Sequence, residues 1–238
     1  MKGWNMVIES PNFFVIWNLE TMILSIDKPV GWTSFDVVKK VRGITKEKKV
    51  GHAGTLDPFA SGLLIIGTGK DTKVLTSISN KDKKYIAELT LGKTTDTLDT
   101  EGKIIHSQSV PELNLDSIKG KLISFLGKQE QVPPMFSAKK KNGTRLYKLA
   151  RKKIVVDREP IIIEIKEIEL VHLKNNCILF SVCCSKGTYI RVLGKDIAEK
   201  LGTVGYLTSL KRMKIGHYDL KYSQTISEFE SAWRSTAH

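Results

Sequence analysis

The chain has 238 residues, of which 41% are hydrophobic, 8% aromatic and 26% charged, a composition that excludes intrinsically disordered and collagen-like proteins. This length allows one large domain, or one domain with a small appendage, and either can bury a substantial core. Lysine and arginine outnumber aspartate and glutamate by 38 to 25, and the net charge of +13 favours a polyanionic partner, with nucleic acid ahead of an anionic membrane.

The cysteines and histidines do not have the spacing of a disulfide framework or of a metal site. The three cysteines are odd in number and two of them, Cys183 and Cys184, are adjacent, while the five histidines are scattered along the chain. The longest early apolar run, residues 13–17, is too short for a signal segment or a membrane span. We therefore predict a cytoplasmic protein without a metal site.

The start of the chain predicts one strand and one helix. Residues 1–21 have no clear pattern and form a leader of unknown role. Residues 22–26 predict a strand that ends in the turn Asp27-Lys28-Pro29. Ser34 is the expected cap of a short helix, because apolar residues follow it at helical spacing, namely Val37, Val41 and Ile44.

Residues 51–69 are rich in glycine and contain Pro58, so they predict a loop that leads into the buried apolar run 63–66. This loop carries His52 and Asp57 just before a rigid strand, where glycine lets the backbone approach a ligand closely. The alternative is that Asp57 simply opens a turn with Pro58, which is the more common role of aspartate in such a pattern. The local pattern leaves both interpretations open.

The rest of the chain predicts strands and helices without a regular alternation. Residues 85–91 alternate in polarity as a half-buried strand does, and residues 161–165 and 177–184 predict two antiparallel strands joined by a turn at residues 174–176. Two helices are predicted from apolar stripes, the second ending at Gly202; the stripes are Leu115, Ile118, Leu122 and Phe125, and Ile190, Leu193, Ile197 and Leu201. This order predicts an α+β fold with a mixed, largely antiparallel sheet flanked by helices.

Residues 139–153 hold eight lysine and arginine residues and no acidic residue, with Tyr147 among them. A charge run of this kind is in general more often a solvated helix face than a binding site. Here the run coincides with the positive net charge of the whole chain and with aromatic residues that can stack on bases. Nucleic-acid binding is therefore the favoured interpretation.

Several blocks of the sequence resemble one known family. Beside the loop segment GHAGTLDPFASGLL, they are KPVGWTS (28–34), KDKKY (81–85), GKTTDTLD (92–99), QVPPMFSAKKKNGTRLYKL (131–149) and KGTYIR (186–191). In this order, and over residues 22–215, the chain is similar to the bacterial tRNA pseudouridine synthase B (TruB) family. The resemblance implies the pseudouridine synthase fold with a central RNA-binding cleft, and the conversion of uridine 55 in the T loop of tRNA to pseudouridine.

The resemblance also sets expectations for domains and partners. Residues 22–215 would form the catalytic domain, and residues 216–238 a short tail in the place of the C-terminal PUA domain that most family members carry. The family uses no metal and no cofactor. We expect the T arm of tRNA as partner, with no membrane and no obligatory protein partner.

The resemblance assigns roles to residues around the target uridine. Asp57 is implied as the catalytic carboxylate, and Arg191 would form an ion pair with it and keep it charged. Tyr85 would stack on the flipped base and help to remove the proton from its carbon 5. His52 would fill the space that the base leaves in the T loop, although a histidine held by local hydrogen bonds explains this position too.

Other matched positions are implied as supports and contacts. Lys28 and Pro29 would support the strand that carries the stacking tyrosine. Tyr189 and Leu210 would line the base pocket, and Asp99 would help to order the flipped loop. The basic segment would clamp the RNA arm through Lys139, Lys140, Lys141, Arg145, Lys148 and Arg151.

Two other functions are compatible with this fold. A tRNA-binding chaperone in which modification is dispensable needs only the basic surface, so the joint presence of Asp57, Tyr85 and Arg191 favours the enzyme. A catalytic subunit that works with a guide RNA uses a further C-terminal domain, for which residues 216–238 leave no room.

Overall fold

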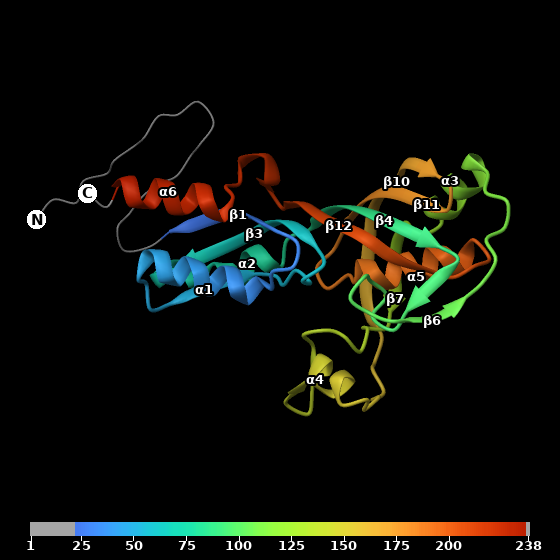
Figure 1. Ribbon diagram of the computed structural model, residues 1–238, viewed down its shortest axis with the longest axis horizontal. Coiled ribbons are helices and arrows are strands. Elements are labelled where there is room, and N and C mark those ends of the chain that lie inside the picture. Colours follow the sequence, from blue (N-terminus) through green and yellow to red (C-terminus); the bar gives the residue numbers. More distant parts are fainter. Residues whose placement is uncertain (1–21, 237–238) are drawn as a thin grey trace, which may run out of the picture. The chain divides into compact units, whose positions relative to one another are not determined.

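The computed structural model describes residues 22–236, so the leader expected over residues 1–21 lies outside the described part of the chain. The chain divides into two compact units. The first unit consists of the residues up to Lys83 together with those from Lys211 onward, and the second unit consists of residues 84–210. Figure 1 shows the elements of both units, coloured along the sequence.

The first unit is built around strand β3 (Ser61–Thr68), in which every residue after Ser61 is buried. Strands β1 (Ile23–Lys28) and β2 (Val50–Ala53) both pair with β3 in the antiparallel sense. The end of β12 (Gly205–Ile215) pairs with β3 in the parallel sense, and β13 (Tyr218–Asp219) folds back on β12. The apolar run predicted over residues 63–66 is therefore confirmed as a buried strand.

Two apolar clusters hold the first unit together. Helices α1 (Ser34–Thr45) and α6 (Ile226–Thr236) share a cluster with β1 and β3, in which Val37, Val41 and Phe229 are fully buried. Lys40 on α1 also lies 2.6 Å from the Glu230 carboxylate on α6. The second cluster involves α2 (Leu75–Ser79) and the 3-10 turn η2 (Leu220–Tyr222), and a further 3-10 turn η1 (Gly69–Lys73) follows β3.

Two expectations from the sequence are wrong in this unit. Helix α1 is capped by Thr33 and not by Ser34, because the Thr33 hydroxyl accepts from the Asp36 N–H at 3.1 Å and the Thr33 N–H donates to the Asp36 carboxylate at 2.8 Å. The glycine-rich stretch 51–69 is not one loop, since its first residues belong to β2 and only residues 54–60 lie between strands. Pairing with β3, the next strand along the chain, outweighs the local glycine content here.

The second unit holds a sheet in which β12 is followed in order by β4 (Lys83–Leu91), β11 (Cys177–Cys184), β10 (Ile161–Lys174) and β7 (Gly127–Gln131). β10 pairs in the antiparallel sense with both β11 and β7. The three strands predicted here are confirmed, although β10 is longer than its apolar start suggested. The turn into β11 places Asn175 at a φ of 51°.

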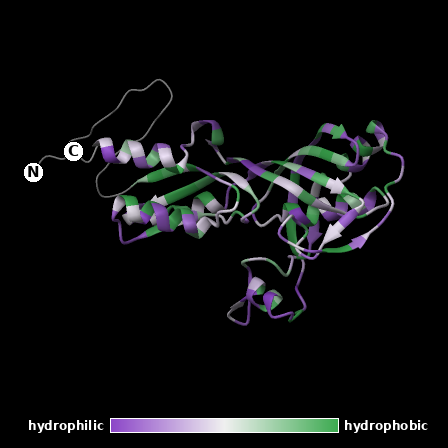
Figure 2. Cartoon of the chain, viewed as in Figure 1, coloured by the Kyte–Doolittle hydropathy of each residue, from purple (hydrophilic) through white to green (hydrophobic). Residues whose placement is uncertain are grey.

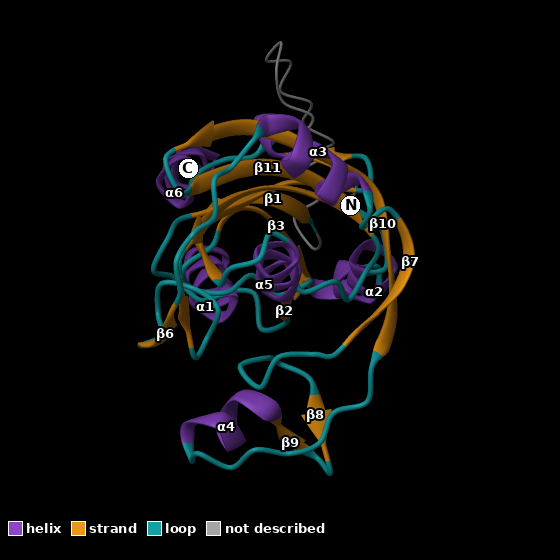
Figure 3. Ribbon diagram, turned by 90° about the vertical axis from the view of Figure 1, so that its right-hand side faces the viewer, coloured by secondary structure: helices purple, strands orange, loops and turns teal. Residues whose placement is uncertain are grey.

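Both predicted helices of this unit are present as α3 (Leu115–Ile123) and α5 (Ile190–Lys200). α5 buries Ile190, Leu193 and Ile197 and ends just before Gly202, as predicted. Strands β5 (Lys93–Thr95) and β6 (Ile104–Ser107) form a small separate ribbon. Between β7 and β10, the short strands β8 (Lys140–Lys141) and β9 (Thr144–Arg145) and helix α4 (Leu146–Arg151) form a lobe of their own (Figure 3).

The mixed, largely antiparallel strands with their accompanying helices confirm the α+β class predicted from the order of elements. Within residues 22–236, no helix combines the length and the apolar character that a membrane crossing would require.

Candidate active site

Asp57 lies in the loop of residues 54–60, which joins β2 to β3 in the first unit. Its side chain is half-buried, whereas Leu56, Phe59 and Ala60 around it are buried in the core. The Ala60 N–H donates to the Asp57 carbonyl at 3.1 Å, so a turn does begin at Asp57. The carboxylate is thus carried by a short turn whose apolar neighbours are packed into the unit.

A buried lysine supports this loop on one side. Lys28 at the end of β1 is 0% exposed, and its ammonium donates to the carbonyl oxygens of Pro29 at 2.8 Å and Trp32 at 2.6 Å. A longer contact of 3.5 Å reaches the Pro58 carbonyl, which also accepts from the Gly31 N–H at 2.8 Å. A buried charge needs polar partners, and the Lys28 ammonium finds them in carbonyl groups of the turn after β1 and of the Asp57 loop. Lys28 therefore holds this turn against the loop.

Ser34 supports the same loop from the start of α1. Its hydroxyl accepts from the Leu56 N–H at 2.8 Å and lies 3.2 Å from the Leu56 carbonyl. One side chain therefore satisfies both backbone polar groups of the residue just before Asp57. The sequence pattern had assigned Ser34 to helix capping, so this contact was missed.

The third support, Arg212 on β12, was also missed. Its side chain is 1% exposed and donates from Nε to the Leu63 carbonyl at 2.8 Å, and from Nη2 to the Gly54 carbonyl at 3.1 Å. Nη1 lies 3.5 Å from the Thr55 carbonyl. The one available signal is positional, because Arg212 occupies the same face of an alternating strand as the buried Leu210.

Two more residues with a role implied by the resemblance lie in the first unit, namely Pro29 and His52. Pro29 provides one of the carbonyl groups that Lys28 contacts. His52 is half-buried on β2, where it lies opposite Ile66 of β3. The structure therefore brings Lys28, Pro29 and the Asp57 loop together, and places His52 on the strand that enters this loop.

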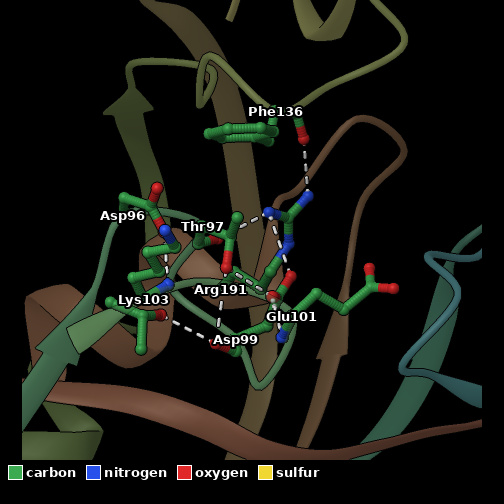
Figure 4. A network of polar contacts seen from close by, with 8 residues as sticks. Asp96, Thr97, Asp99, Glu101, Lys103, Phe136 and Arg191 are labelled. Atoms are coloured by element: carbon green, nitrogen blue, oxygen red, sulfur yellow. Dashed lines mark hydrogen bonds and ion pairs between the residues drawn. The ribbon is translucent and has the colours of Figure 1, made fainter. Parts of the chain in front are cut away.

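The second unit holds the other assigned residues, of which Arg191 and Asp99 are in direct contact (Figure 4). Arg191 Nη1 lies 3.3 Å from Asp99 Oδ2 and donates to the Thr97 carbonyl at 2.7 Å. Asp99 Oδ1 accepts from the Thr97 hydroxyl at 2.5 Å and from the Glu101 N–H at 3.0 Å. Arg191 is 4% exposed and Asp99 2%, so this is a buried charge pair with several supporting hydrogen bonds.

Tyr189, two residues before Arg191, is held by a side chain that the sequence did not single out. The Gln131 amide donates to the Tyr189 carbonyl at 3.1 Å and accepts from the Tyr189 N–H at 2.8 Å. Gln131 is 4% exposed at the end of β7. This pair fixes the backbone at the start of α5, while Tyr85 on β4 and Leu210 on β12 are both buried within the second unit.

The basic segment begins next to this network. Arg191 Nη2 donates to the Phe136 carbonyl at 2.7 Å, three residues before the first lysine of the run (Figure 4). Within the lobe, the Leu146 side chain is 1% exposed and its N–H donates to the Lys139 carbonyl at 2.8 Å. The assigned basic residues are all exposed, which agrees with the hydrophilic colouring of the lobe in Figure 2; they are Lys139, Lys140, Lys141, Arg145, Lys148 and Arg151.

The lobe is not a long solvated helix. α4 has six residues, and the first lysines lie in the β8–β9 hairpin instead. Lys141 donates to the Asp157 carbonyl, and Arg151 lies over the Tyr147 ring at 5.6 Å from its centroid. Among residues 22–236, no group of three or more histidine, cysteine or acidic side chains is arranged to hold a metal ion.

Comparison with protein families matches residues 42–190, more than half of the chain, to the family described as TruB family pseudouridylate synthase (N terminal domain). A protein of Clostridium kluyveri named tRNA pseudouridine synthase B is 46% identical over 209 residues, which are 88% of this chain and 72% of that protein. A protein of the same name from Clostridium perfringens is 48% identical over 197 residues, or 82% of this chain and 67% of that protein.

Among solved structures, a chain from the crystal structure of a Cbf5-Nop10-Gar1 complex superposes with a TM-score of 0.70 at 25% identity. The superposition covers 91% of this chain and 56% of that chain. A chain from an archaeal box H/ACA sRNP Nop10-Cbf5 complex, at 22% identity and a TM-score of 0.67, shows the same fold. The present chain thus spans a little over half of these solved chains.

Proposed function

Because the chain belongs to the TruB family of pseudouridylate synthases, we propose that it isomerises a uridine of tRNA to pseudouridine, and that this uridine is position 55 in the T loop. The observation that carries the proposal is the likeness to relatives named tRNA pseudouridine synthase B over more than four-fifths of the chain. The isomerisation breaks the bond between nitrogen 1 of uracil and the ribose, and the same ribose carbon then bonds to carbon 5 of the base. The proton on carbon 5 is lost and one returns to nitrogen 1, so no atom is gained or lost overall.

Asp57 is the proposed essential carboxylate. It lies on a short loop that buried side chains hold by its backbone, while its own side chain remains half-buried. Such an arrangement suits a group that must act on a bound nucleoside, because a rigid backbone limits the positions that the carboxylate can take. Arg191 is the proposed cation that keeps this carboxylate charged, in addition to its contact with Asp99.

The other assigned residues are proposed to handle the extruded base. Taking a base out of its stack costs a few kcal/mol, and stacking on an aromatic ring offsets part of that cost. Tyr85 is the proposed ring and also the group that helps to remove the proton from carbon 5, with Tyr189 and Leu210 beside it. His52 would fill the space left in the T loop, and Asp99 would help to order that loop.

The lobe that carries the basic residues is proposed to contact the phosphates of the T arm. Its assigned lysine and arginine side chains are exposed, and the segment before it is tied to Arg191 through the Phe136 carbonyl. Phosphate contacts fix orientation without reading sequence. If the lobe contacts only phosphates, the residues around Asp57 would recognise the target uridine.

The test is pseudouridine formation by the purified chain in an unmodified tRNA transcript, with no other protein or RNA added. We expect modification at uridine 55, none in a transcript with cytidine at that position, and loss of at least about 100-fold in the Asp57→Asn variant. Absence of product with the wild-type chain would refute the proposed function, whereas a rate in Asp57→Asn above about a hundredth of the wild-type rate would refute only the role of Asp57.

The chaperone function is the second candidate, and the exposed basic lobe is the observation that favours it. If the chain is a chaperone, the Asp57→Asn substitution should not change how well it binds tRNA or how much it speeds tRNA refolding. Measuring transcript refolding beside modification therefore separates the two functions, because they depend on different residues.

A further inference from the structure

Arg212 connects both ends of the Asp57 loop to one strand. On the entry side, Gly54 and Thr55 come just before Asp57, and their carbonyl oxygens lie 3.1 and 3.5 Å from Nη2 and Nη1. On the exit side, the Leu63 carbonyl accepts from Nε at 2.8 Å. A single guanidinium therefore spans the loop from β12, whose end is paired with β3.

Two glycines next to Arg212 leave room for it beside the loop. Gly62, opposite Arg212 in the parallel pairing, has a φ of +101°, and a Cβ added there would lie 2.4 Å from the Arg212 carbonyl oxygen. Gly54 has a φ of +82°, and a Cβ there would lie 3.6 Å from Arg212 Nη1. Glycine at position 62 is thus required for the close approach of β12 that puts Arg212 beside the loop.

The chemistry of the contact distinguishes it from ordinary core packing. Arg212 is 1% exposed, and within residues 22–236 its partners are three carbonyl oxygens, with no acidic side chain within 4.0 Å. A buried cation is a costly way to fill space, since an apolar side chain of similar size usually serves stability at least as well. A planar fork with fixed donor directions is, however, well suited to hold several carbonyl groups at set positions.

We propose that Arg212 is a positioning residue for catalysis, which fixes the backbone on both sides of Asp57 so that its carboxylate is held in a reactive position. This inference rests on the proposed function of Asp57. Arg212 acts through the loop and does not itself touch the reacting nucleoside. Loss of the guanidinium is expected to lower the rate of the chemical step more than the affinity for tRNA, because a small misplacement of a reacting group is costly in rate.

The experiment compares Arg212→Lys and Arg212→Met with a control of similar instability. Phe229→Leu is that control, because Phe229 is fully buried in the apolar cluster that α1 and α6 share with β1 and β3, and it is not a hydrogen-bond partner of Arg212. For each variant, kcat and KM are measured with the tRNA transcript in excess, and the rate of the chemical step is measured separately in a single turnover. Both measurements are made at a temperature where thermal unfolding shows the protein to be folded.

The expected result is a fall in kcat of about 10- to 100-fold in Arg212→Met with little change in KM, and a smaller fall in Arg212→Lys, which keeps the charge but has one donor atom. The Phe229→Leu control should keep kcat within about twofold at an equal loss of thermal stability. Arg212 variants with normal kcat, or a control with the same deficit, would overturn the proposal.

Amide hydrogen exchange supplies a readout that does not depend on activity and needs only the milder Arg212→Lys variant. In the loop, the Leu56 N–H donates to the Ser34 hydroxyl and the Ala60 N–H donates to the Asp57 carbonyl, whereas the N–H groups of β1 and β3 are bonded within the sheet. Faster exchange confined to the loop is expected, and a uniform increase throughout the unit would overturn the proposal. If the wild-type chain makes no pseudouridine, the proposed function fails and the exchange result still reports whether Arg212 holds the loop.

Discussion

Arg191 and Asp99 form an ion pair in which Nη1 lies 3.3 Å from Oδ2, with only 4% and 3% of the two side chains exposed. The same guanidinium donates to the carbonyl oxygens of Thr97 and Phe136. One buried cation at the start of α5 therefore ties down both the turn that carries Asp99 and the chain segment that leads into the basic lobe.

Asp99→Asn keeps the size of the side chain but removes the charge that compensates Arg191. Removing the negative charge from this buried pair is expected to cost about 2–3 kcal/mol of unfolding free energy. Urea unfolding of the purified variant measures this loss. Asp96→Asn is the matched control in the same turn, because Asp96 is exposed and accepts from the Lys103 N–H, a contact worth about 1 kcal/mol. Equal losses in the two variants would show that the buried charge pair is not what stabilises this turn.

Tyr85→Phe should separate catalysis from binding. The variant keeps the aromatic ring at a position that is 8% exposed, and it loses only the hydroxyl group that is proposed to help remove the proton. Retention of tRNA in a filter assay should be close to wild type, while the single-turnover rate should fall by about 100-fold or more. Tyr206→Phe on β12 serves as the control and should change neither quantity. A normal rate in Tyr85→Phe would remove the hydroxyl from the mechanism.

The basic lobe should determine how tRNA affinity depends on salt. Replacing Lys139, Lys140 and Lys148, which are all exposed, with alanine removes up to three phosphate contacts. Each lost contact should flatten the plot of log affinity against log salt by about 0.7 to 0.9. The rate at saturating tRNA should change little, because these side chains are proposed to touch phosphates and not the reacting uridine.

A charge-matched control makes this prediction specific. Lys119, Lys128 and Lys174 are also exposed in the second unit but lie on α3, β7 and β10. Their replacement with alanine changes the net charge by the same amount and should leave the slope nearly unchanged. Equal slopes for the two triple variants would mean that overall charge, and not the lobe, attracts the RNA.

The cap of α1 should make stability depend on pH. The hydrogen bond from the Thr33 hydroxyl holds the pKa of the Asp36 carboxyl below its usual value. The pKa of Asp36 is lower in the folded chain than its unfolded value near 4. The hydrogen bond therefore contributes its full stabilisation of the fold at pH values above about 4, and this contribution is lost as the pH falls through the folded pKa. Thr33→Val should therefore cost about 1 kcal/mol at pH 7 and less at about pH 3.

Unfolding in urea at the two pH values measures this difference. Thr100→Val is the control, because Thr100 is exposed in a turn of the second unit and should show the same small effect at both pH values. A Thr33→Val deficit that does not shrink in acid would show that the hydroxyl acts without the Asp36 carboxylate.

Two glycine variants should differ in stability for a steric reason. Gly31 has a φ of +83° with no atom within 4 Å of an added Cβ, whereas at Gly62 the added Cβ would lie 2.4 Å from the Arg212 carbonyl oxygen. Gly31→Ala should cost about 1–3 kcal/mol of backbone strain alone. Gly62→Ala carries a similar strain and must also displace β12, so its unfolding free energy should fall further or the protein should not fold. Equal stability of the two variants would contradict the close packing of β12 on β3.

Local patterns in the sequence were sufficient to predict eight elements of the fold, namely β1, β3, β4, β10, β11, α1, α3 and α5. The alternating polarity of residues 85–91 and the apolar stripe of α5 specify a strand and a helix, because side-chain direction repeats every two residues in one and every 3.6 in the other. The motifs around Asp57 and Arg191 likewise indicated the family, since they are contiguous in the chain. The patterns did not show β2, which pairs with β3, nor the long strand β12 and the helix α6.

The partners of the site residues were decided by the tertiary structure. Ser34 has the sequence of a helix cap, yet its hydroxyl contacts Leu56, 22 residues away. Arg212 follows the Asp57 loop by about 150 residues, and the Asp99 partner of Arg191 is 92 residues before it. Periodicity reports which face of an element is buried but carries no information about which distant group will lie opposite. For that reason the local patterns were enough to indicate the family and part of the secondary structure, while the contacts that hold the Asp57 loop and the Arg191 guanidinium follow only from the folded chain.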